Sequence, residues 1–321
     1  MRSAVHERAG TAAWELARPA RPSRVAGVSM AGFRDRGTSP AGHRAIPHPG
    51  VTLALAFGAG PLIVDAAGRQ QRGSVVAGLG FGPGTVRVRG EHFEAVQVRL
   101  SPVVARAVLG VSPADLDGAV LPLDDLWGRE ASRIRERLSE ISSWEDRFAL
   151  TDALLARRAA GPAVDPEVSW AWEQIVASRG RVRVDRLAAE IGWSRKRLWS
   201  RFRSQIGLPP KRAAKLVRFD HAAHRLAAGA DAARVAVEVG YADQSHLHRD
   251  VLSFAGVTPV ALAGEPWLAV DDIVWAGHGT PGQRRLWRRS PVPEPAARPR
   301  TPSPGPDPGV VRRSGRAAWQ G

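Results

Sequence analysis

The sequence predicts an α+β protein, with an N-terminal small antiparallel β domain, helices after it, and a C-terminal domain that is all helical. Three observations lead to this fold class. Apolar and polar residues alternate in segments of residues 51–100, apolar residues recur at helical spacing after Pro102, and prolines interrupt the chain at residues 161–166. Alternation is the period of a half-buried strand, whereas apolar residues three and four apart form one face of a helix.

The predicted strands are short and separated by glycines. Alternation begins at residues 51–55 and is strict at Val86–Arg89 and Val96–Arg99, while residues 61–64 and 75–77 are apolar runs. Residues 1–50 are rich in Gly, Pro and Arg, and we expect them to be irregular, with at most one short strand. These segments predict a small antiparallel sheet, a sandwich or a barrel.

The predicted helices span residues 102–109, 124–141, 144–159 and 166–178, with a single turn starting at residues 112–115. Pro162 and Pro166 break any helix between the last two of these, so we expect the linker there. No other internal stretch is as clear a candidate for a domain boundary.

The positive charge is concentrated in two places. The chain carries 46 Lys and Arg against 31 Asp and Glu, and residues 170–260 hold 16 of these basic residues against 8 acidic ones. Residues 276–321 hold 9 arginines and 2 acidic residues in a Pro- and Gly-rich sequence, which we expect to be a disordered basic tail. Such local excess indicates a polyanionic partner, nucleic acid or an anionic surface.

The absence of cysteine excludes disulfides, thiol redox chemistry, cysteine nucleophiles and Cys-based zinc sites. Charged residues near the N-terminus are not followed by an apolar stretch, so a signal peptide is not expected. The longest apolar region, residues 51–64, is interrupted by glycines and a proline and is too short to span a bilayer. We therefore expect a cytoplasmic protein with no membrane partner.

Residues 184–207 have the pattern of a short helix, a glycine turn and a basic second helix. We expect Asp185 to cap the first helix, Gly192 to end it and Ser194 to cap the second. The second helix is expected to bury Leu198, Phe202 and Ile206. Its remaining positions are mostly basic, and a rigid helix with such a face suits base edges and phosphates. The segment therefore predicts a helix-turn-helix unit.

A second unit follows in the same basic segment. Asp231 and Asp243 are expected to cap its two helices, and Gly240 to end the first. Between the units, residues 210–228 predict one helix of 19 residues, roughly 28 Å long at 1.5 Å per residue. Two units joined by one helix are a much stronger signal than one unit alone.

The residues of both units resemble those of the AraC/XylS regulators over about residues 170–262. The first unit reads Ser194-x-x-x-Leu198-x-x-Arg201-Phe202-x-x-x-x-Gly207-x-Pro209. The more specific string is Val235-Ala236-x-x-x-Gly240-Tyr241-x-Asp243-Gln244-Ser245-His246-Leu247-x-Arg249, followed by Gly256-x-Thr258-Pro259. Leu247 and Val251 stand where the family usually has Phe, and each keeps an apolar side chain.

The resemblance implies a sequence-specific DNA-binding transcriptional regulator that reads two major-groove segments with two recognition helices. It implies double-stranded DNA and RNA polymerase as partners, a small-molecule effector, a monomer or homodimer, and no enzyme activity, catalytic residue, cofactor or metal. The base-reading positions fall on Lys196, Trp199, Ser200, Gln244, Ser245, His248 and Arg249. The positions better placed for phosphates are Arg195, Arg203 and Lys211.

Three side chains keep alternative roles. Trp199 either contacts DNA or packs on a neighbouring helix, and Arg201 either contacts DNA or pairs with an acidic residue of the chain. His246 is better suited to a structural role beside the helix cap than to base reading. These alternatives depend on packing that the sequence does not define.

The predicted domains are an N-terminal sensing or dimerisation domain (1–160), a linker (161–168), a DNA-binding domain (169–265) and the tail (277–321). A different interpretation of the first domain is a metal-binding cupin-like or enzymatic domain fused to a DNA anchor, with His92, Glu94, His43 and His48 as ligands. A third is a domain that makes only protein contacts. The glycines of residues 78–84 are expected to form a turn, because a strand follows them where a phosphate loop would open a helix.

Overall fold

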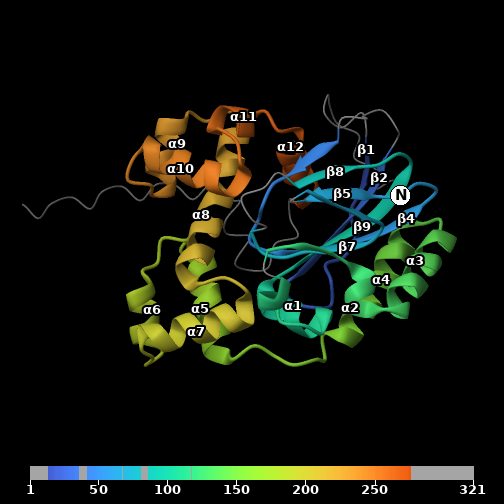
Figure 1. Ribbon diagram of the computed structural model, residues 1–321, viewed down its shortest axis with the longest axis horizontal. Helices are drawn as coiled ribbons and strands as arrows, with labels where there is room; N and C mark the ends of the chain where they lie inside the picture. Colours follow the sequence, from blue (N-terminus) through green and yellow to red (C-terminus); the bar gives the residue numbers. More distant parts are fainter. Residues whose placement is uncertain (1–13, 36–41, 67, 81–85, 117, 276–321) are drawn as a thin grey trace, which may run out of the picture. The chain divides into compact units, whose positions relative to one another are not determined.

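Two antiparallel sheets form the N-terminal half of the protein, as the sequence predicts (Figure 1). The computed structural model describes residues 14–35, 42–66, 68–80, 86–116 and 118–275 of the 321-residue chain. One sheet has six strands in the order β1-β2-β9-β4-β7-β10, and the other has four in the order β3-β8-β5-β6. The strands are β1 (Trp14–Ala17), β2 (Val28–Asp35), β3 (His43–Ala45), β4 (Val51–Gly58), β5 (Ile63–Ala66), β6 (Arg69–Arg72), β7 (Val75–Ala77), β8 (Val86–Arg89), β9 (Phe93–Leu100) and β10 (Val120–Pro122).

The first fifty residues contain more strand than expected. They hold β1, β2 and β3, and β2 pairs with β9 from Val28 opposite Leu100 to Arg34 opposite Glu94. Most of β2 is buried on both faces, so its sequence, VSMAGFRD, carries no clear alternation. The expectation that residues 1–50 are irregular was therefore wrong, because a strand buried on both faces does not show the alternation on which that expectation relied.

The two faces of β9 meet different surroundings. Val96, Val98 and Leu100 are fully buried in the core that the sheet shares with the helices. Gln97 and Arg99, on the opposite face, line a cavity together with residues of both sheets. The alternation predicted for a half-buried strand is confirmed, but its polar side chains face a cavity inside the protein.

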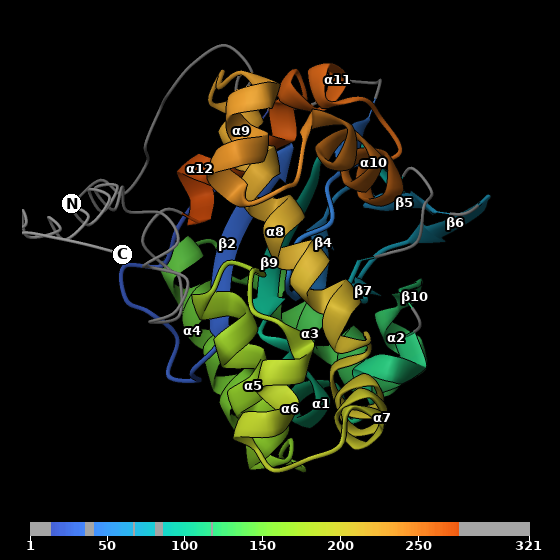
Figure 2. The same cartoon turned by 90° about the vertical axis from the view of Figure 1, so that its left-hand side faces the viewer.

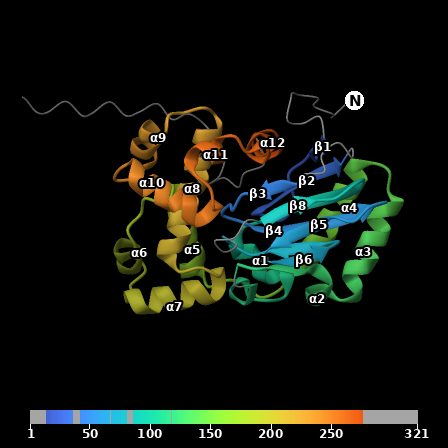
Figure 3. The ribbon, with the colours of Figure 1, turned by 45° about the horizontal axis from the view of Figure 1, so that its top comes forward.

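Four helices follow β9 and lie by the six-stranded sheet (Figure 3). They are α1 (Pro102–Leu109), α2 (Leu123–Trp127), α3 (Arg129–Glu140) and α4 (Trp144–Arg158), with a 3-10 turn, η1 (Pro113–Leu116), after α1. The single helix expected over residues 124–141 is two helices, because Gly128 has φ 52° and ψ −131°, a conformation that suits glycine. Among the described helices, none is long and apolar enough to cross a membrane.

The C-terminal half of the described chain is helical, which confirms the fold class. Its helices are α5 (Pro166–Ala177), α6 (Val184–Glu190), α7 (Arg195–Ile206), α8 (Pro210–Ala227), α9 (Ala232–Val239), α10 (Gln244–Ala255), α11 (Pro259–Ala263) and α12 (Pro266–Trp275). Figure 2 shows α6 and α7 at one end of α8, and α9 and α10 at the other. The predicted basic tail, residues 277–321, lies outside the described residues, as do residues 81–85 of the glycine-rich turn.

The last described helix, α12, returns to the N-terminal sheets and contacts β2 and β3. Val270, Val274 and Trp275 are buried in the same apolar cluster as Trp14 and Phe33. Arg99 of β9 donates from Nη2 to both carboxylate oxygens of Asp271, at 2.6 and 2.7 Å. The side chain of Asp271 is only 5% exposed, so α12 is held to β9 by a buried ion pair.

A second buried ion pair fixes α4 on the six-stranded sheet. The Arg147 side chain is 5% exposed and pairs with Glu94 of β9, which also accepts from Arg34 at 3.2 Å. Nε of Arg147 donates to the Leu138 carbonyl at 3.2 Å, and its guanidinium group lies 4.5 Å from the centre of the Phe57 ring. Glu94 therefore balances the charge of a buried arginine.

We predict that Glu94→Ala lowers the free energy of unfolding by about 3 kcal/mol, because it leaves the buried Arg147 charge uncompensated. Asp65→Ala is the matched control: it removes the pair with Arg89, in which both side chains are about 40% exposed, and should cost at most about 1 kcal/mol. Urea unfolding followed by circular dichroism measures both. Equal losses would show that burial of the Arg147 pair has no special effect.

Candidate DNA-binding surface

The first recognition helix, α7, has one buried and one exposed face. Ser194 accepts a hydrogen bond from the Arg197 backbone N–H, which confirms the predicted cap. The side chains of Leu198, Phe202 and Ile206 are fully buried, also as predicted. The predicted site residues of this helix all lie on its exposed positions: Arg195, Lys196, Trp199, Ser200 and Arg203.

Trp199 is 47% exposed, which is unusual for an indole ring. The Arg203 guanidinium group lies 5.3 Å from the ring centre, within the same helix. The structure therefore shows no burial of Trp199 comparable with that of Leu198 or Phe202. An exposed aromatic ring beside a guanidinium group is suited to apolar contact with a sugar or a thymine methyl group.

The helix before α7 begins earlier than expected. Arg183 is the N-terminal flanking residue of α6, and Asp185 lies in its first turn, so the prediction of an Asp185 cap was wrong. Asp185 instead pairs with Arg183 at 3.2 Å and with Arg195 at 3.3 Å. Arg195 is the first residue of α7, so its exposed pair with Asp185 links the starts of α6 and α7. Gly192 has φ 67° in the turn between the two helices, as its predicted role requires.

The second unit repeats this architecture in α9 and α10. The predicted caps are confirmed, since Asp231 accepts from the Arg234 N–H and Asp243 from the His246 N–H. Gly240 ends α9 with φ 88°. Leu247 and Val251 are fully buried, so the two residues that replace the usual Phe still pack in the core. The predicted site residues of α10 are all exposed: Gln244, Ser245, His248 and Arg249.

The basic residues near the two helices differ in whether contacts within the chain already engage their side chains. Lys211, in the first turn of α8, is exposed, as its predicted role requires. Arg201 pairs with Asp165 at 3.0 Å, which supports the intramolecular alternative for this residue. Nε of Arg249 donates to the carbonyl of Ser245 at 3.3 Å within its own helix. The ring of His246 packs edge-on against Tyr241, in agreement with a structural role.

A buried carboxylate that the sequence analysis did not identify joins α10 to α8. Asp250 is 3% exposed, accepts a hydrogen bond from Lys215 at 2.8 Å and lies 3.7 Å from Arg218. The Arg218 guanidinium group lies 4.6 Å from the centre of the Tyr241 ring. Asp250 follows Leu247 by three residues and precedes Phe254 by four, so its position on the inward face was the available signal.

The residues considered as metal ligands have other partners. Glu94 pairs with Arg34 and Arg147, and Nε2 of His48 is 2.7 Å from the Thr52 hydroxyl group. His48 is buried, and this burial lowers its pKa well below the ordinary value. Over the described parts of the chain, no three His, Cys, Asp or Glu side chains come together as a metal site.

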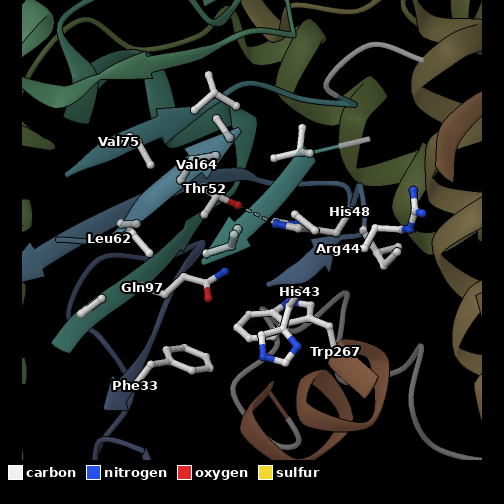
Figure 4. Close-up of a pocket in the computed structure, with 18 of the residues that line it drawn as sticks. Phe33, His43, Arg44, His48, Thr52, Leu62, Val64, Val75, Gln97 and Trp267 are labelled. Atoms are coloured by element: carbon white, nitrogen blue, oxygen red, sulfur yellow. Dashed lines mark hydrogen bonds between the residues drawn. The ribbon is translucent and has the colours of Figure 1, made fainter. Parts of the chain in front are cut away.

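A cavity of about 90 Å³ lies against both sheets and α12 (Figure 4). Its walls are mainly apolar, with Leu62, Val64, Val75, Val86 and Phe93 among them. Its polar lining residues are His43, Arg44, His48, Thr52, Gln97 and Arg99. His43 and His48 were expected only as metal ligands, and the sequence does not predict the cavity that they line.

The helix pairs α6–α7 and α9–α10 form two helix-turn-helix units. Residues 187–264 match the family model described as a helix-turn-helix domain. The matched segment begins in α6 and ends just after α11. This DNA-binding domain is of the AraC type, as the resemblance implied. Among the curated proteins, none matches the chain.

Several solved structures resemble the chain. ToxT from Vibrio cholerae O395 is 11% identical with a TM-score of 0.41, over 74% of this chain and 97% of that one. The C-terminal domain of AraT, a response regulator from Geobacillus stearothermophilus, is 20% identical with a TM-score of 0.29, over 31% and 85%. The AraC-like transcriptional activator CuxR is 16% identical with a TM-score of 0.23, over 60% and 81%.

We predict that Asp250→Ala lowers the free energy of unfolding by about 3 kcal/mol, because it removes the buried partner of Lys215 and Arg218. Glu238→Ala is the control in the same unit: it removes exposed pairs with Arg225 and Arg234 and should cost at most about 1 kcal/mol. Thermal unfolding of the full chain measures both. A loss for Asp250→Ala no larger than that for Glu238→Ala would contradict the structural importance of this carboxylate.

Proposed function

We propose that α7 and α10 read two successive major-groove segments of duplex DNA, and that the chain regulates transcription from that site. The observation that carries the proposal is common to both helices. Each is capped at its N-terminus, buries an apolar face and leaves polar residues exposed at the start of the helix. The N-terminal residues of a recognition helix are the ones that contact base edges.

The connecting helix supports reading by both units. α8 has 18 residues, one fewer than predicted, which corresponds to roughly 27 Å. Successive major-groove segments on one face of DNA are about 34 Å apart. Modest bending of the DNA closes this difference. The two recognition helices carry different sequences, so the preferred site is asymmetric.

The exposed residues divide into two proposed roles. Lys196, Trp199 and Ser200 on α7 are the proposed base readers of the first segment. Those of the second segment are Gln244, Ser245, His248 and Arg249 on α10. Arg195, Arg203 and Lys211 are the proposed phosphate contacts. The first unit carries more positive charge and should supply more of the sequence-independent affinity.

The cavity is the candidate site for a small-molecule effector. Its apolar walls and few polar groups are the usual composition of a ligand site. Its location on the N-terminal sheets favours a sensing role for this part of the chain over a role in protein contacts alone. The domain boundaries at residues 160 and 168 are proposed from the sequence. The apolar core is continuous across them, from α1–α4 into α5–α8.

We predict that inserting five base pairs between the two protected DNA segments sharply weakens binding. Half a helical turn places the second major-groove segment on the opposite side of the duplex, out of reach of α10. Footprinting locates the segments, and titration of original and lengthened duplexes measures the loss. The control for length is the same five base pairs inserted outside the two protected segments, which leaves their spacing unchanged. Undiminished affinity after five base pairs would mean that only one unit reads DNA.

A second prediction separates base readers from phosphate contacts. Lys196→Ala should relax the preference at one position of the site, and Arg249→Ala at another, by about 1–3 kcal/mol each. Lys211→Ala should weaken binding to all sequences alike and lower the salt slope by about one. Competition with duplexes altered at single positions distinguishes the two patterns. The same uniform loss for Lys196→Ala and Lys211→Ala would refute the division of roles.

A further inference from the structure

One wall of the cavity comes from the helix that follows the DNA-binding domain. Trp267 of α12 lines the cavity and stacks on Phe33 of β2, with ring centres 5.3 Å apart and planes at 23°. It also packs edge-on against Trp14, at 5.9 Å. Figure 4 shows Trp267 facing the same space as Phe33, His43 and Gln97. The cavity is therefore complete only when α12 lies on the sheets.

Three residues that line the cavity, Gln97, Arg99 and His43, carry hydrogen-bond donors. Nε of Arg99 is buried and has no acceptor among the described residues, although Nη2 is engaged by Asp271. The Gln97 amide projects into the cavity two residues before Arg99 on β9. The Trp14 indole N–H can only donate, so Nε2 of His43 accepts at 3.1 Å, and the proton of the neutral ring is on Nδ1.

The α12 wall is connected to the second helix-turn-helix unit. Only Gly264 and Glu265 separate α11 from α12. Arg44 of β3, another residue of the cavity wall, donates from Nε to Glu265 at 2.8 Å and from Nη1 to the carbonyl of Ala255 at 3.3 Å. Ala255 is the last residue of α10, so one arginine contacts the cavity, the connection to α12 and the end of the recognition helix.

We infer that this cavity binds a small, mainly apolar ligand with one hydrogen-bond acceptor, and that Trp267 and Arg44 transmit its binding to the second helix-turn-helix unit. This inference rests on the proposed effector site and deepens it. The apolar walls define the body of the ligand, and the donors of Gln97, Arg99 and His43 define its polar group. The ligand can be neutral, because both arginines of the cavity wall already pair with carboxylates.

The direction of the effect follows from linkage. A ligand that contacts Trp267 together with the sheets binds only the docked position of α12, and therefore stabilises it. Docked α12 restrains α11 and the end of α10 through Gly264, Glu265 and Arg44. A DNA site that engages α10 in this restrained position must in turn strengthen ligand binding by the same factor.

The ligand class is tested on the full chain with acetophenone, an aromatic ring with one carbonyl acceptor, and with ethylbenzene, which keeps the ring but has no acceptor. Ligand-observed NMR should show about three- to tenfold tighter binding of acetophenone. Ala77→Leu and Ala54→Leu, which narrow the cavity, should each weaken acetophenone binding while circular dichroism stays unchanged. Absent acetophenone binding, equal affinities, or binding unaffected in a folded narrowed variant would overturn the ligand assignment.

The transmission is tested by hydrogen exchange with and without acetophenone. Protection should rise in residues 266–275 and in residues 244–263, and should stay constant in residues 195–206. Trp267→Ala should abolish the rise, whereas Val260→Ala, which changes an 84% exposed residue of α11, should preserve it. A rise confined to the strands would overturn the transmission. DNA footprinting of the same preparation without acetophenone separates the two proposals, since its failure counts against DNA reading alone.

Discussion

The buried ion pair between Arg99 and Asp271 holds α12 on the N-terminal sheets. Removing two charges from water is unfavourable, and here the cost is offset by hydrogen bonds to both oxygens of Asp271 and by the Trp275 indole N–H, which donates to Asp271 at 3.2 Å. The Arg99 guanidinium group also lies 4.3 Å from the centre of the Trp275 ring. Because this pair holds α12 against β9, it also determines that Trp267 covers the cavity.

The two helix-turn-helix units are held to the rest of the chain by different contacts. Near the first unit, Gln205 of α7 accepts a hydrogen bond from the Asp165 N–H at 2.7 Å, and Ser112 donates to the Ser204 carbonyl at 2.5 Å. The second unit is held through Arg44 and through α12. The units therefore share the long helix α8 but have separate attachments, so a change at one attachment need not reach the other unit.

Local sequence predicts the DNA-binding domain well because its signals are local. Ser194, Asp231 and Asp243 cap helices within three residues of their own positions, and glycines such as Gly240 adopt the positive φ that ends a helix. Exposure of the proposed readers follows from the same periodicity. The cap expected at Asp185 failed because α6 begins at Val184, which leaves Asp185 inside the first turn, where it pairs with Arg183 and Arg195.

The features that the sequence did not predict depend on contacts between distant residues. β2 is covered on both faces, so its apolar residues show no alternation. Gln97 and Arg99 have the pattern of a solvent-facing strand side, and only the folded chain shows that α12, about 170 residues later, covers them. Asp250 has a similar origin, since its burial depends on Lys215 and Arg218 of another helix.

The return of α12 to the sheets also bears on how such a protein can be recombined. Regulators of this organisation look like two modules that a single crossover at residues 161–168 could exchange. In this chain, such a crossover would replace α12 together with the DNA-binding domain, leaving Arg99 without Asp271 and exposing Phe33 and Trp14. A functional chimera needs a second junction after residue 263, so that the sheets keep the helix that covers them. Along the gene, the helix-turn-helix units therefore lie between two segments that pack on each other.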